Sequence, residues 1–263
     1  MKKIKLMILA GGWVFAGILF AGTITREYNK NVEFVKGGDI SVRLPNGNIY
    51  VQTWNKNNVD VHADITIHSS SKNEAEEFLQ EMEIVIRRHD DRLEIYVDKP
   101  KTDGFDVLDW FFGNRGLRSS INFNIKVPKE SNVELKSING SIEISELQGR
   151  ARLKTTNGRI VAETMYGELE AETTNGSISA DMNVNELRDH VQLSTVNGSL
   201  HLTVPSSIAA DVDISTVNGS INTDFPLTVE GKWGPKHVDG EINGGGYSLR
   251  LTSVNGSVTL KSQ

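Results

Sequence analysis

An Asn-Gly dipeptide recurs through the chain and restricts it to a repetitive β architecture. Six copies in the second half are separated by 18, 18, 22, 21 and 37 residues. These predicted corners are Asn139-Gly140, Asn157-Gly158, Asn175-Gly176, Asn197-Gly198, Asn218-Gly219 and Asn255-Gly256. Both residue types accept positive φ, so each pair is predicted to form a tight corner. Corners at such regular spacing are typical of a repeat protein.

Apolar and polar residues alternate on both sides of these corners. Around Asn157-Gly158 the apolar positions include Leu153, Ile160 and Ala162, and the same pattern surrounds an earlier copy at Asn46-Gly47. Alternation with a period of two predicts half-buried strands that flank each corner.

Two architectures accommodate these strands. In an antiparallel meander, each Asn-Gly forms a hairpin turn. In a β-solenoid, each unit is one coil and the corners stack into a column. Glycines at a nine-residue step from Gly140 to Gly176 indicate two strands and two corners per coil, which favours the solenoid. The expected fold is therefore mostly β, a single-stranded parallel β-solenoid of the right-handed β-helix type, preceded by an N-terminal hydrophobic helix.

Three regions are expected along the chain. Residues 1–25 combine Lys2, Lys3 and Lys5 with an uncharged run, the pattern of a cleaved signal peptide or an uncleaved signal anchor. The positive-inside rule then places the rest outside the cytoplasm. Residues 26–128 form an N-terminal β part with one helix over 71–82, and residues 129–263 form the solenoid. Within the solenoid, 230–246 are expected to be a loop that leads to the last coil.

Composition excludes several classes of function. The chain has no cysteine, which excludes disulfides, cysteine-ligated metals and lipid attachment to cysteine. Its net charge of -6 argues against nucleic-acid binding. The six histidines form no closely spaced ligand pair, and no dinucleotide, phosphate-binding or nucleophile motif is present. We expect no cofactor and no metal.

Carboxylates concentrate at Glu168, Glu170 and Glu172, and Glu143 and Glu163 are expected to lie near them. Two carboxylates in a cleft could hydrolyse glycosides. An exposed row on a flat sheet supplies no cleft, so a solvated face is the favoured interpretation and no catalytic residue is predicted.

The most unusual non-repetitive segment is a connection over residues 98–120. It contains Phe105, Trp110, Phe111 and Phe112, whereas loops are normally polar. These aromatic residues either cover an open end of the solenoid or form a docking patch for a membrane or a partner. They are the candidate partner-binding residues.

The quoted repeats resemble a known bacterial family. IKVPKESNVELKSINGSIEI, LTVPSSIAADVDISTVNGSI and GEINGGGYSLRLTSVNGSVTLKSQ are similar to segments of the "putative adhesin" family, over about residues 31–263. The resemblance implies an exported or membrane-anchored β-solenoid at the cell envelope, without catalytic residues.

The expected function is accordingly a non-catalytic binding or structural module of the cell envelope. Its partner would be an envelope component or another protein, with membrane contact through residues 6–25 if that segment is not removed. Two alternatives stay open, a polysaccharide-active β-helix enzyme and an envelope-stress sensor that presents a partner-binding face.

Overall fold

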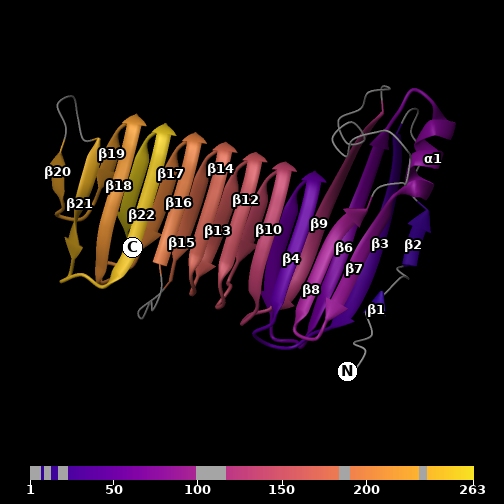
Figure 1. Ribbon diagram of the computed structural model, residues 1–263, viewed down its shortest axis with the longest axis horizontal. Coiled ribbons are helices and arrows are strands. Elements are labelled where there is room, and N and C mark those ends of the chain that lie inside the picture. The colour runs from indigo at the N-terminus through magenta and orange to yellow at the C-terminus, as the bar shows by residue number, and fades with distance from the viewer. Residues whose placement is uncertain (1–6, 9–12, 17–22, 99–116, 184–189, 231–235) are drawn as a thin grey trace, which may run out of the picture.

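The protein is a stack of β-coils that share one hydrophobic core between two sheets (Figure 1). The computed structural model describes residues 7–8, 13–16, 23–98, 117–183, 190–230 and 236–263. Within them, sheet A has twelve strands and sheet B has eleven, and one helix, α1 (Lys72–Glu81), lies between β6 and β7 in the chain. The mostly-β prediction is confirmed.

In both sheets the order of the strands in space differs from their order in the chain. From one edge to the other, sheet A consists of β1 (Met7–Ile8), β7 (Glu83–His89), β8 (Arg92–Asp98), β4 (Asp39–Asn46), β10 (Asn132–Asn139), β12 (Ala151–Asn157), β14 (Leu169–Asn175), β16 (His190–Asn197), β22 (Tyr247–Asn255), β18 (Ala210–Asn218), β21 (His237–Ile242) and β20 (Thr228–Glu230). Sheet B consists of β19 (Ile221–Thr223), β23 (Val258–Ser262), β17 (Leu200–Val204), β15 (Ile178–Met182), β13 (Ile160–Met165), β11 (Ile142–Ser145), β5 (Ile49–Trp54), β9 (Arg118–Pro128), β6 (Asn58–His68), β3 (Thr23–Glu33) and β2 (Trp13–Ala16).

Both sheets are mixed, which corrects the expectation of a purely parallel solenoid. Sheet A is parallel from β8 to β18, and sheet B is parallel from β9 to β19. Antiparallel pairs flank these regions, with β7 on β8, β21 on β18 and β6 between β3 and β9. The regular 18-residue coil demands parallel strands, and the end segments lack that period.

The corners stack by close backbone contact. A Cβ on Gly140, Gly158 or Gly176 would lie 1.8–2.1 Å from the carbonyl oxygen of the corner glycine in the preceding coil. None of the corner asparagines has positive φ, so the expected reason for the motif was incomplete. Glycine is required mainly because the coils approach too closely for any side chain.

Side chains connect the same corners. Five of the six corner asparagines, all except Asn139, donate from Nδ2 to Oδ1 of the asparagine in the adjacent coil, at 2.7–2.9 Å. Two residues before three of these asparagines lie Thr155, Thr173 and Thr195. Each donates from Oγ1 to the glycine carbonyl of the preceding coil at 2.9–3.0 Å. The buried threonine hydroxyls would otherwise lack partners, whereas the asparagine amides are exposed and could bond to water instead.

The predicted inward residues form the core. Leu135, Leu153 and Leu193 are buried in sheet A, and Ala162 and Ala180 are buried in sheet B. Each buried leucine contributes about 1.5–3 kcal/mol of hydrophobic stabilisation.

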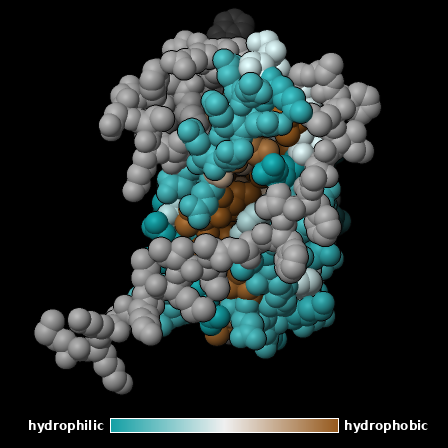
Figure 2. Space-filling model, turned by 90° about the vertical axis from the view of Figure 1, so that its right-hand side faces the viewer, coloured by the Kyte–Doolittle hydropathy of each residue, from teal (hydrophilic) through white to brown (hydrophobic). Residues whose placement is uncertain are grey.

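The end of the stack that carries α1 differs from the repetitive part. The Ser71 hydroxyl accepts the N–H of Glu74 at 3.4 Å, and the helix buries Ala75, Phe78 and Leu79. Figure 2 views this end and shows hydrophobic surface between hydrophilic surfaces. Whether residues 98–120 cover this surface stays a prediction, because 99–116 lie outside the described residues.

The N-terminal segment was predicted to be a hydrophobic helix, and none is present among the described residues. Met7–Ile8 and Trp13–Ala16 are strands that pair with β7 and β3. These two strands extend the ends of both sheets, where backbone groups need partners. No helix in the described part of the chain is long and apolar enough to span a bilayer.

The C-terminal region contains one further correction and one departure from sequence order. Residues 230–246 were expected to be a loop, but His237–Ile242 form β21, which buries Val238 and Ile242 against β18. The last coil, β22 and β23, does not lie at the end of the stack. It lies between the coils β16–β17 and β18–β19.

Candidate functional site: a charged hollow on sheet A

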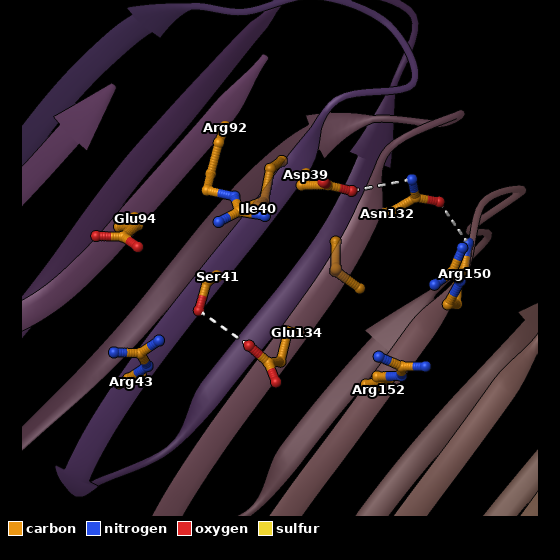
Figure 3. A pocket seen from close by; sticks show the side chains of 11 residues that line it. Asp39, Ile40, Ser41, Arg43, Arg92, Glu94, Asn132, Glu134, Arg150 and Arg152 are labelled. Atoms are coloured by element: carbon orange, nitrogen blue, oxygen red, sulfur yellow. Dashed lines mark hydrogen bonds between the residues drawn. The ribbon is translucent and has the colours of Figure 1, made fainter. Parts of the chain in front are cut away.

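The outward face of sheet A contains a shallow polar hollow of about 290 Å³. Four strands, β8, β4, β10 and β12, supply its walls (Figure 3). We call it the arginine hollow; its lining residues are Asp39, Ile40, Ser41, Arg43, Arg92, Glu94, Asn132, Val133, Glu134, Arg150 and Arg152. Four arginines and three carboxylates line the hollow, in a chain of net charge -6.

Strand register brings these polar residues together. Ser41 pairs with Glu134, which pairs with Arg152, and each lies one residue from a buried apolar position. Because side chains alternate between the faces of a sheet, the inward pattern that builds the core also aims this set outward.

Hydrogen bonds hold the floor of the hollow. Asn132 donates from Nδ2 to Oδ1 of Asp39 at 3.1 Å, and its Oδ1 accepts the N–H of Arg150 at 3.1 Å. The Ser41 hydroxyl donates to Glu134 at 3.4 Å (Figure 3). The Lys136 ammonium donates to Glu134 at 2.5 Å and lowers the pKa of that carboxyl.

The four arginines differ in how they are paired. Arg150 lies 3.1 Å from Glu168, and Arg152 lies 2.9 Å from Glu170, both on the side toward β14. Arg43 and Arg92 are exposed and make no ion pair within 4 Å and no side-chain hydrogen bond with the described residues, although the charge of Arg43 contributes to the lowered pKa of Glu134. These two guanidinium groups are therefore available to an external oxyanion.

The predicted carboxylate cluster is only partly assembled. Glu168, Glu170 and Glu172 lie along sheet A, and each pairs with a cation of the neighbouring strand. Glu143 and Glu163 lie on β11 and β13, on the outward face of sheet B. The expectation that they lie near the other three is wrong, because each corner transfers the chain to the opposite sheet.

His190 joins this cluster, and sequence reasoning missed it. Its Nε2 lies 3.4 Å from Glu168 and 3.2 Å from Glu170, and the three residues are the group in the described chain that could hold a metal ion. Arg150 and Arg152 already balance both carboxylates, which weakens attraction for a cation. The signal was present, because Glu168 and His190 are 22 residues apart, as are corners Asn175 and Asn197.

The candidate partner-binding residues Phe105, Trp110, Phe111 and Phe112 lie outside the described residues. Their role as a docking patch stays a prediction.

This geometry defines the class of the protein, a two-sheet β-solenoid with an open, charged hollow on the outward face of sheet A. Residues 23–261 match the model of the Toastrack DUF4097 family. The chain belongs to this family.

A solved structure shows the same kind of fold. A putative cell adhesion protein from Clostridium sporogenes is 14% identical, covers 91% of this chain and 100% of its own, and superposes with a TM-score of 0.50. A putative adhesin from Bacteroides fragilis is 12% identical, with coverages of 90% and 97% and a TM-score of 0.44. No curated protein matches the chain significantly.

Proposed function

We propose that the chain is a non-catalytic binding module of the cell envelope that holds an acidic glycan in the arginine hollow. The observation that carries this proposal is the pair Arg43 and Arg92, which lack ion-pair partners among the described residues and lie on adjoining strands β4 and β8. A guanidinium group binds carboxylate or phosphate oxygens through paired N–H donors. The oxyanions of a glycan would supply the missing partners.

The shape of the site favours a polymer. The hollow continues into a second one of about 230 Å³ over β10, β12, β14 and β16. Neighbouring strands lie about 4.8 Å apart, so outward side chains form rows that cross the face at that interval. An extended chain of charged sugars can contact several strands at once, whereas a small molecule would remain largely solvated.

Location outside the cytoplasm is part of the proposal. The basic and apolar pattern of residues 1–25 supports export, and the family match begins at residue 23. The family fold thus begins near the end of the predicted export segment.

A polysaccharide-cleaving enzyme is the alternative from another class. Glycoside hydrolysis needs a proton-donating acid and a second carboxylate about 5–10 Å apart around the bound sugar. Glu168, Glu170 and Glu172 instead pair with cations along an open sheet face, which supports binding without catalysis. An envelope-stress sensor would use such a face to bind its partner.

Binding of polygalacturonate to the full-length chain, measured by calorimetry, tests the proposal. The double variant Arg43→Ala/Arg92→Ala should bind at least about tenfold more weakly, because a hydrogen bond to a charged group contributes about 1.5–3 kcal/mol. A matched variant, Arg118→Ala/Arg159→Ala, removes the same charge away from the hollow and should retain affinity. Equal losses in both variants would contradict a specific site.

A further inference from the structure

The last two strands of the chain occupy an internal slot. β22 lies between β16 and β18 in sheet A, and β23 lies between β17 and β19 in sheet B. Figure 1 shows these C-terminal strands within the stack, although residues that precede them in sequence lie farther out. The polypeptide links them to β21 through residues 243–246.

The slot holds β22 and β23 through the same kinds of contact that hold the other Asn-Gly coils. Asn255 donates to Asn197 at 2.8 Å and accepts from Asn218 at 2.8 Å, so it continues the amide ladder on both sides. Leu251 and Leu260 are completely buried. The slot therefore recognises an Asn-Gly coil through the amide ladder at the corner, the register of its strands and the apolar side chains that enter the core.

The slot can also close without an insert. β16 and β18 both align with β22, which places Val191 and Val212 in one row and Asn197 and Asn218 in another. If the insert left, these two coils would pair directly with matched residues. Closure would leave no new unpaired edge in the stack, so departure of the last coil is less unfavourable than removal of an ordinary central strand.

The connection to this coil suits a hinge. Asn243, Gly244, Gly245 and Gly246 have consecutive positive φ values of 50, 88, 78 and 151°. Glycines accept many other conformations, and a Cβ at Gly244 would meet no atom within 4 Å. Extension of the turn would break the hydrogen bonds that Asn243 donates from Nδ2 to the carbonyl oxygens of Ser206 and Ile208, at 3.1 and 2.8 Å.

We propose that residues 247–263 of one molecule fill the slot of a second copy, which joins the molecules by strand exchange. The exchanged coil makes the same contacts between molecules as within one, and the hinge alone changes conformation. The donated coil pairs with a strand of the second molecule at each of its two edges. The Asn-Gly pattern determines which coil the slot accepts.

The absence of cysteine permits a direct test. Gln192 on β16 and Arg250 on β22 are directly paired, at a separation that a disulfide can span. Full-length chains with Gln192→Cys and one affinity tag are mixed with chains that carry Arg250→Cys and another tag. The mixture is unfolded, refolded together and oxidised. A single chain that carries both Gln192→Cys and Arg250→Cys should form an intramolecular disulfide, which verifies the pairing of β16 with β22.

A disulfide-linked heterodimer with both tags is the expected result. The matched control mixes Lys136→Cys chains with Lys154→Cys chains. These two positions are directly paired on β10 and β12. Exchange is not expected there, because the coils follow one another in sequence order. Heterodimer in the first mixture and its absence in the second supports strand exchange. Equal yields, or monomers in both, would overturn it. Glycan binding is not measured, so this result is independent of the proposed function.

Discussion

The corner columns and the arginine hollow are built on some of the same coils, but they use the repeat in opposite ways. At the corners, successive coils carry the same residues because each coil must contact the next at backbone distance. On the outward face of sheet A, paired positions carry Ser41, Glu134 and Arg152, because no contact forces them to match. Stability is therefore concentrated in the repeated positions, and the unmatched positions are free for binding.

Gly176→Ala should produce the largest effect and would break the column directly. The new Cβ would lie 1.9 Å from the carbonyl oxygen of Gly158, so the coils must separate. We expect a loss of more than about 4 kcal/mol in the free energy of unfolding, measured by urea denaturation. Gly244→Ala, which meets no neighbouring atom, should lose only about 1–2 kcal/mol through its positive φ. Similar losses at both sites would contradict close coil contact as the reason for glycine.

Thr173→Val tests the inner ladder with almost no change in shape. It removes the hydroxyl that donates to the Gly158 carbonyl at 3.0 Å in a buried position. The expected loss is about 1–2 kcal/mol. At the exposed neighbour Thr174, the same substitution should change the free energy of unfolding by less than about 0.5 kcal/mol. If the two variants unfold alike, the hydroxyl ladder does not stabilise the corner.

Asn175→Ala removes both of its bonds in the amide ladder, to Asn157 and from Asn197. These groups are exposed, so we expect a loss of about 1 kcal/mol. Asn218 contributes one ladder bond, to Asn255, and Asn218→Ala should lose about half as much. Thermal unfolding of both variants checks the ratio, and an equal loss at the two positions would show that the ladder bonds are not what stabilises them.

Lys136→Met should have the smallest effect on stability, and it acts on the hollow through Glu134. The pKa of Glu134 should rise toward the ordinary value of a glutamate, because its hydrogen bond with Lys136 is the largest cause of its lowered pKa. A carboxyl with a lowered pKa stabilises the fold above its unfolded pKa and loses that contribution as the pH falls through the folded value. Wild type and variant should therefore differ slightly at neutral pH and converge in acid. NMR titration of Glu134 measures the shift, and an unchanged pKa would contradict the assigned cause.

Much of the stack could be predicted from the sequence. The alternation around Asn157-Gly158 reports burial directly, because an inward residue such as Leu153 must be apolar and its neighbours need not be. The order of the last coils could not be predicted. β18 and β22 carry the same pattern and fit the same neighbour, so the sequence does not distinguish an inserted coil from a terminal one.

The candidate site was harder to predict for a physical reason. Arg92 and Arg43 are 49 residues apart, and only the pairing of β8 with β4 brings their strands together. Outward positions have no periodic signal of their own. The His190 contact with Glu168 was within reach, because coil length alone predicts it.

Hydroxyl-radical footprinting of the full-length chain, with and without polygalacturonate, would locate a bound glycan on the protein surface. If the arginine hollow is the binding site, the glycan protects outward residues of β4, β8, β10 and β12, and corner residues and sheet B are unchanged. Protection confined to the segment 98–120, which includes Phe105, Trp110, Phe111 and Phe112, or to the outward face of sheet B would contradict binding in the hollow.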